Sequence, residues 1–320
     1  MHFKKYYVLI YIISIHSTAF GGVSVKAPLD SIIKPTSSFL RSADTFNLKR
    51  FLIVSGATSL SFAGSFIYLN NSWWSDKKTS FHFDGGKRLK HMFILKRDGK
   101  YAKNLDKAGH FLGGIITSDL TSSSLSWAGL KSGKELLIGG VFGSVIQGFI
   151  EYKDGFAPTW GFSIYDLLSG SLGSFYPYFQ TRSRLLKSID IKFSYYKRNN
   201  YYQSITGRNY WNDDYINQTY WLTFNPYRLN KKTNWPKWLG ISLGFGVNDH
   251  LNSYNIGMPN GESDLGKGAY EFYLSPDLDF TEILPKKYPW QKFAKILNFI
   301  KFPAPALRIS NQPKLLPIYF

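Results

Sequence analysis

The sequence contains no cysteine among its 320 residues, so disulfide bonds, thiolate metal ligands and a lipid-modified N-terminal cysteine are all excluded. Recognisable chemical motifs are also missing. The six histidines lack metal-ligand spacing, and there is neither a phosphate-cradling glycine loop nor a nucleophile elbow. We therefore expect no cofactor and no metal ion.

Acidic residues are scarce relative to basic ones, 21 against 39, which gives a formal net charge of +18. The basic residues are scattered as small pairs such as Lys87-Arg88, Lys231-Lys232 and Lys286-Lys287, whereas nucleic-acid binders cluster them on one helix or motif. Aromatic residues make up 18% of the chain, a content that suits membrane interfaces. The predicted partners are membrane lipids, including anionic ones, and not nucleic acid; no protein partner is indicated.

The N-terminus has the pattern of a secretory signal. Lys4-Lys5 precede a short apolar core at residues 8–15, and small residues follow at a cleavage site, so we predict a signal peptide over 1–19. An uncleaved anchor is the alternative. Residues 20–48, with glycine, proline, serine and threonine, read as a linker. The chain is thus expected to be exported to the cell envelope, at the outer membrane or a periplasm-facing membrane.

An uncharged stretch at 51–69 lies between basic residues and the pair Trp73-Trp74, which is typical of a helix that spans or lies on a membrane. A buried helix of a soluble domain is the alternative. After a polar loop at 76–104, three helices are predicted at 104–125, 132–152 and 163–176.

The three later helices are rich in glycine and serine. Each interior glycine costs about 1 kcal/mol against alanine, but small residues four apart let helices approach closely, as they do in lipid. We predict a compact bundle partly immersed in the membrane; tight packing in a soluble bundle is the alternative.

After Arg184 the apolar period changes to two, most clearly where Leu239 to Val247 alternates with small residues. We expect five or six strands and a short amphipathic helix at 289–301. Single-chain barrels begin at eight strands, although the terminal Phe320 resembles the ending of outer-membrane barrels. The prediction is an α+β chain: a membrane-associated helical domain at 49–183, then an antiparallel β-rich domain at 184–320 that forms a partial sheet or a barrel-like one.

Five ionisable residues stand out in the apolar helices: Asp106, His110, Glu151, Asp154 and Asp166. Asp106 and His110 are one helical turn apart, so the carboxylate could orient the imidazole as a general base. The alternatives are a favourable charge at a helix start for Asp106 and a hydrogen-bonded buried side chain for His110.

Glu151 and Asp154 lie at the C-terminal end of a helix, where negative charge is unfavourable without a partner. That partner could be Lys153, charged His110, Arg182 or a bound cation. Asp154 before Gly155 is also an ordinary helix stop. Ser163-x-x-Asp166 resembles a capping box, in which each side chain binds the other's backbone amide.

These residues also carry a family resemblance. Asp106-Lys107-x-x-His110, Glu151-x-x-Asp154-Gly155 and Gly161-Phe162-Ser163-x-x-Asp166 resemble the uncharacterised YfiM-like family of predicted periplasmic lipoproteins, in the Bacteroidetes-type version with a β-rich extension. A distant similarity runs to VanZ-like membrane proteins, which usually have Asn where this chain has Gly170. The resemblance implies an envelope location and a helical domain, and it leaves the chemistry open.

Two functions follow from the sequence. The first is a cell-envelope membrane protein with a structural or interaction role, in which the Asp/His/Glu cluster fixes helix packing. The alternative is an enzyme acting on an envelope lipid or glycan, with His110 as general base beside Asp106 and Glu151. Convergence of His110, Glu151 and Asp166 at a cavity wall would favour the enzyme.

Overall fold

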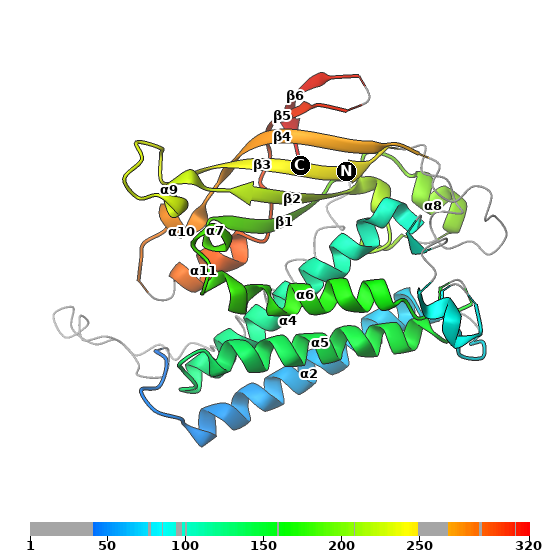
Figure 1. Ribbon diagram of the computed structural model, residues 1–320, viewed down its shortest axis with the longest axis horizontal. Helices are drawn as coiled ribbons and strands as arrows, with labels where there is room; N and C mark the ends of the chain where they lie inside the picture. The colour runs from blue at the N-terminus through cyan, green and yellow to red at the C-terminus, as the bar shows by residue number, and fades with distance from the viewer. Residues whose placement is uncertain are drawn as a thin grey trace, which may run out of the picture. The chain divides into compact units, whose positions relative to one another are not determined.

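Helices precede an antiparallel sheet in the structure, which confirms the predicted α+β class (Figure 1). The computed structural model describes residues 41–75, 78–84, 86–93, 98–99, 101–158, 160–207, 209–248, 268–287, 290–310 and 312–320. The predicted signal peptide and most of the predicted linker lie outside these residues.

The four long helices lie where the apolar periodicity predicts them. They are α2 (Leu48–Ser72), α4 (Leu105–Trp127), α5 (Lys134–Asp154) and α6 (Ile164–Gln180). Shorter elements are η2 (Leu89–Phe93), η3 (Tyr101–Asn104), α7 (Arg184–Lys187), α8 (Tyr201–Thr206), η4 (Tyr215–Asn217), α9 (Pro226–Leu229), α10 (Phe280–Ile283) and α11 (Trp290–Leu297). The predicted loop at 76–104 therefore contains two 3-10 turns, and α11 falls within the predicted amphipathic segment.

Helices α4 and α6 pack so closely that Gly114 and Gly173 cannot carry a side chain. A Cβ at Gly173 of α6 would overlap the carbonyl oxygen of Phe111 in α4, and one at Gly114 would overlap that of Gly170. The small residues are thus needed for the α4–α6 contact, as the sequence predicts.

We expect Gly173→Ala to destabilise the protein by about 1–3 kcal/mol, because the added methyl group pushes α6 away from α4. Gly148→Ala is the matched control: its Cβ would lie 3.7 Å from Leu167 Cδ1, an ordinary contact. Unfolding in denaturant measures both variants. Equal stability of the two would contradict the packing argument.

Helix α2 is long and apolar enough to cross a membrane, the one such helix among the described residues. Phe62 and Phe66 pack against the ring of Phe149 in α5. Large side chains elsewhere on α2 are exposed, including Leu60 with 77% of its surface in contact with solvent. Helix α2 therefore presents most of its apolar surface outward.

The sheet has six strands in sequence order and remains open: β1 (Ile189–Tyr195), β2 (Gln218–Phe224), β3 (Leu239–Val247), β4 (Tyr270–Leu278), β5 (Ala304–Arg308) and β6 (Lys314–Tyr319). All neighbours are antiparallel. The free edge of β1 is joined by the segment 299–301, since Phe193 N donates to Phe299 O and Lys301 N donates to Phe193 O, both at 2.9 Å. The sheet is thus the predicted partial sheet.

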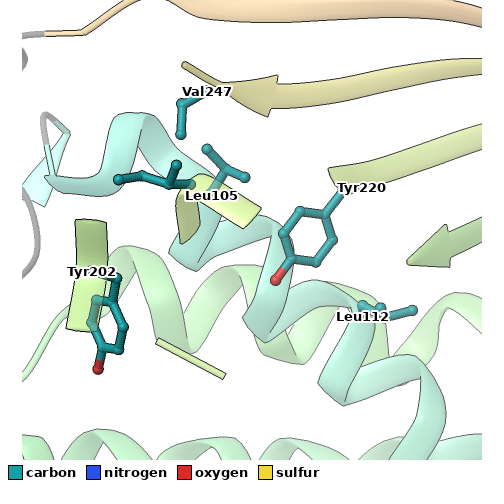
Figure 2. Packing of buried hydrophobic residues seen from close by; sticks show 6 residues of the cluster. Leu105, Leu112, Tyr202, Tyr220 and Val247 are labelled. Atoms are coloured by element: carbon teal, nitrogen blue, oxygen red, sulfur yellow. The ribbon is translucent and has the colours of Figure 1, made fainter. Parts of the chain in front are cut away.

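Strand register separates an apolar face from a polar one. One row across the apolar face reads Ile191, Leu222, Leu243, Leu274, Leu307 and Leu315. Leu222 in the middle of β2 is 45% exposed. Helix α4 covers this face over β1 and the adjoining ends of β2 and β3, where Leu105 and Leu112 meet Tyr220 and Val247 (Figure 2). The helices and the sheet therefore share one hydrophobic core.

The polar face of the sheet is turned inward and buried. Lys192 Nζ lies 3.0 Å from Asp277 Oδ2, and both side chains are almost fully inaccessible. The C-terminal strand closes over this face, because the Tyr319 ring stacks on Tyr273 with centroids 4.3 Å apart and its hydroxyl lies 3.0 Å from that of Thr219. Strand β6 thus reaches back to β2, so the sheet is strongly curled.

Candidate functional site

The five predicted site residues line one cavity of about 50 Å³. It forms where the N-terminal ends of α4 and α6 meet the C-terminal end of α5. Asp106 and Asp166 lie in first turns, where the helix dipole favours a negative charge, whereas Glu151 lies in a last turn, where it does not. The cavity has room for a water molecule or a small reacting group.

Lys107 binds three carboxylates at one side of the cavity. Its Nζ lies 2.7 Å from Asp98 Oδ1, 3.3 Å from Asp106 Oδ2 and 3.1 Å from Asp166 Oδ1. Burial opposes its charge, but the three carboxylates together raise the pKa of Lys107 above its usual value. Lys107 is therefore an ammonium ion that ties α4, α6 and the preceding loop together.

A strained turn brings Asp98 to this cluster. Ala102, Lys103 and Asn104 all have positive φ angles, of 44°, 55° and 65°, immediately before α4. Left-handed residues other than glycine cost of order 1–3 kcal/mol each and persist only where the surroundings compensate. Here Lys107 Nζ also donates to the carbonyl oxygen of Asp98 at 3.2 Å, which helps to hold the turn.

His110 is positioned by Gln147 of α5. The distance from His110 Nδ1 to Gln147 Oε1 is 2.9 Å, and because a carbonyl oxygen only accepts, Nδ1 carries the proton. His110 Nε2 then faces Glu151 Oε1 at 3.5 Å. The helical spacing suggested Asp106 as the orienting group, but the carboxylate of Asp106 faces Lys107 instead.

Glu151 is the most buried of the five, with 1% of its side chain exposed. Its Oε2 accepts a hydrogen bond of 2.9 Å from the backbone amide of Ser163, whereas its Oε1 has no hydrogen-bond partner. Burial, and then the nearby Asp166 and Asp154, raise the pKa of Glu151 well above its usual value. Of the partners predicted for Glu151, the structure supplies His110; Lys153 lies over the Trp74 ring, 5.0 Å from its centroid.

The predicted capping box is only half correct. Ser163 Oγ accepts a 3.0 Å hydrogen bond from the amide of Asp166, so Ser163 caps α6. The amide of Ser163 donates to Glu151 and not to Asp166. The reciprocal role predicted for Asp166 is therefore wrong, because Lys107 attracts its carboxylate toward the cavity.

Asp154 ends α5, as the helix-stop pattern predicts, and it also accepts a 2.6 Å hydrogen bond from Trp74 Nε1. Burial raises the pKa of Asp154 to about 7, although the bond from Trp74 lowers it. Asp154 is therefore positioned to change its charge near neutral pH.

We expect the fluorescence of Trp74 to change with a midpoint near pH 7, as Asp154 is neutral below this pH and charged above it. Because the folded-state pKa is raised, the folded protein binds the proton more tightly than the unfolded chain, and this contribution to stability is lost as the pH rises. A pH titration of the wild type and Asp154→Asn measures the effect. A transition of the same size in Asp154→Asn would assign it to another group.

Two sets of side chains could hold a cation: His110, Glu151 and Asp166, or Asp98, Asp106 and Asp166, with ligand atoms within 4.8 Å of one another. The ammonium group of Lys107 already binds the second set. Any further cation would therefore have to bind the first set, at His110 and Glu151.

Gln147 and Asp98 are among the residues of the site that sequence reasoning missed. Gln147 could have been found, because it is four residues before Glu151 in an otherwise uncharged run and so shares its helical face. No sequence pattern indicates that Asp98 belongs to the site, because only the left-handed turn at 102–104 brings it next to Lys107. The chain matches no protein-family model, no curated protein and no solved structure, so the YfiM-like and VanZ-like resemblance stays a prediction.

Proposed function

We propose that this protein is an acid–base enzyme of the cell envelope that acts on a membrane-borne lipid or glycan. The observation that carries the proposal is the pair formed by His110 Nε2 and Glu151 Oε1, 3.5 Å apart at the wall of a cavity. Glu151 Oε1 is buried without a hydrogen-bond partner, so its position is not explained by packing alone.

The pair is suited to move one proton. Gln147 fixes the proton of His110 on Nδ1, which leaves the Nε2 lone pair free to accept a proton from a substrate hydroxyl or a water in the cavity. The resulting imidazolium would be stabilised by the adjacent Glu151 carboxylate. Where Glu151 instead carries the proton, as its raised pKa favours, the same pair acts as an acid.

A second cavity supports an amphiphilic substrate. It has a volume of about 280 Å³ and is lined by Trp74, Lys78, Tyr152, Lys153, Phe156, Ala157 and Pro158. Trp74 borders this cavity while its Nε1 binds Asp154 of the first one. Rings and two lysines together fit an apolar tail with an anionic group, and the apolar, exposed helix α2 fits a membrane location.

The structural role suggested by the sequence fits Lys107 and the carboxylates around it better than it fits His110 and Glu151. Lys107 joins carboxylates from three segments, and these contacts fix the helix ends whatever reaction occurs nearby. We therefore assign the packing role to Lys107, Asp98 and Asp106, and the chemistry to His110 and Glu151.

The proposal predicts that Glu151→Gln and His110→Ala lower the turnover of an envelope lipid or glycan by about 10²–10⁴-fold, because general acid–base catalysis contributes that much. Purified protein is incubated with lipid and glycan fractions of the source membrane, and products are followed by mass spectrometry. Asp119→Asn is the matched control, an acid on α4 that pairs at 3.7 Å with Lys295, whose side chain is 56% exposed.

Thermal unfolding of each variant separates chemistry from packing. Normal unfolding temperatures with lost turnover support the enzyme. If the wild type converts nothing in these fractions, or if His110→Ala only lowers the folded yield, the enzyme proposal fails and the structural role remains. Inner- and outer-membrane fractionation of the source cells, with lipid analysis of a deletion strain, tests the predicted location.

A further inference from the structure

The outer side of the sheet is apolar and exposed beyond the area that α4 covers. We call the exposed apolar face of β3, β4, β5 and β6 the outer sheet face; it comprises Ile241, Leu243, Tyr270, Phe272, Leu274, Leu307, Leu315 and Ile318. Leu243 in the middle of β3 is 47% exposed and Leu274 beside it is 44% exposed. Contiguous apolar surface of this kind marks an interaction site.

Polarity in this part of the sheet is inverted relative to a water-soluble sheet. The strands alternate, so that Glu271, Tyr273, Ser275 and Asp277 of β4 are buried while the apolar residues between them are exposed. Soluble antiparallel sheets bury the apolar side and expose the polar one. Strands in contact with hydrocarbon show the opposite arrangement, as observed here.

The carboxylates on the buried polar side are paired with cations inside the sheet. Asp277 binds Lys192 and accepts hydrogen bonds from Thr223 and Ser242, at 2.9 and 3.0 Å. The carboxylate of Glu271 binds Arg308, with Nη1 3.0 Å from Oε1. These charges therefore need no water on the apolar side of the sheet.

The ends of the outer sheet face carry the residues expected at headgroup depth. Strands β3 and β4 each have nine residues, within the length that a tilted strand needs to cross hydrocarbon. Trp238 precedes β3 and is 47% exposed, and Tyr270 lies at the opposite end in register with Val247. Amphipathic rings at both ends are typical of the two membrane interfaces. Exposed Lys237 beside Trp238 suits anionic headgroups.

We propose that the outer sheet face contacts the acyl chains of a bilayer, with Trp238 and Tyr270 at its two headgroup regions. A protein partner is disfavoured because protein–protein interfaces carry about one hydrogen bond per 100–200 Å², which requires polar groups on the contacting surface. The three central register rows that this face has on β3 and β4 offer only apolar side chains: Ile241 with Pro276, Leu243 with Leu274, and Phe245 with Phe272. The inference goes beyond the proposed function, since it holds whether or not the cavity catalyses a reaction.

The absence of native cysteine makes a direct test possible. Leu243→Cys and Leu274→Cys are each labelled with a nitroxide in the full chain, which is reconstituted in vesicles of phosphatidylethanolamine and phosphatidylglycerol. Lys231→Cys, on an exposed turn, is the control. We expect labels at 243 and 274 to be accessible to oxygen and protected from a water-soluble nickel chelate, and the label at 231 to show the reverse.

Two results would overturn the inference. The first is nickel access at 243 and 274 equal to that at 231, which would place the face in water. The second is low access to both reagents with spin–spin broadening, which would show a second copy of the chain on the face. If Leu243→Cys does not fold, Leu307→Cys replaces it as the labelled position, because Leu307 is 40% exposed on the same face. Each label reports only its own surroundings. The accessibilities at 243 and 274 therefore test the outer sheet face even if α2 alone anchors the protein or the cavity catalyses no reaction.

Discussion

Lys107→Met is expected to destabilise the protein by about 3–5 kcal/mol at neutral pH, because it leaves buried carboxylates without their cation. Asp106 and Asp98 are affected most directly, since Lys107 is the charge that lowers their pKa values against the effect of burial. The free energy of unfolding, measured by denaturant titration in detergent, gives the size of the loss.

The pH dependence of this loss has a definite sign. Burial holds the pKa of Asp106 above its usual value, and removal of Lys107 raises it further, so the folded variant takes up protons at higher pH than the wild type. The difference in stability should therefore shrink as the pH falls and the carboxylates become neutral. Lys131→Met, at an exposed position, should change stability by less than about 0.5 kcal/mol. A loss that does not vary with pH would assign the effect to packing of the side chain.

Asp277→Asn is expected to cost a similar amount, about 3–5 kcal/mol, inside the curled sheet. Asp277 lies between Lys192 Nζ at 3.0 Å and Lys301 Nζ at 3.9 Å, and neither lysine side chain has any exposed surface. With the carboxylate gone, the buried ammonium group of Lys192 has no counter-charge. Lys301, whose pKa burial already lowers to about 8, then loses its proton more readily because Asp277 no longer raises that pKa. Thermal unfolding in detergent measures the loss.

Removing one lysine in the same background tests the cause. Asp277→Asn combined with Lys192→Met should regain part of the lost stability, because the uncompensated charge of Lys192 is removed. Glu282→Gln is the matched control, as Glu282 pairs with Lys286, whose side chain is 63% exposed; we expect a cost below about 1 kcal/mol. A double variant no more stable than Asp277→Asn would rule out charge as the cause.

Local patterns in the chain predict the elements well. Apolar runs with glycine predicted α4, α5 and α6, and the alternation from Leu239 to Val247 predicted β3 together with its two unlike faces. These features depend on residues close in sequence, whose periods of 3.6 and 2 are set by backbone geometry. The gathering of the five acidic and histidine residues was also predictable, because they lie near helix ends joined by short connections.

Features that depend on distant residues could not be predicted. The polar side of the sheet is the buried one because β6 closes over it. Alternation alone does not say which side faces inward. The pairing of His110 with Gln147, and the placement of Asp98 by a left-handed turn, likewise arise from tertiary contacts.

The pairing of β1 with the segment at 299–301 has a consequence for biogenesis. The backbone N–H and C=O groups of Phe193 find their partners only in residues that are synthesised about a hundred positions after it, so the edge of β1 stays open while the chain emerges. Unpaired edges are templates for aggregation, and contacts between distant residues form slowly. A holding chaperone would therefore matter most for this protein before its last strands arrive, and truncation ahead of residue 299 should leave an aggregation-prone fragment.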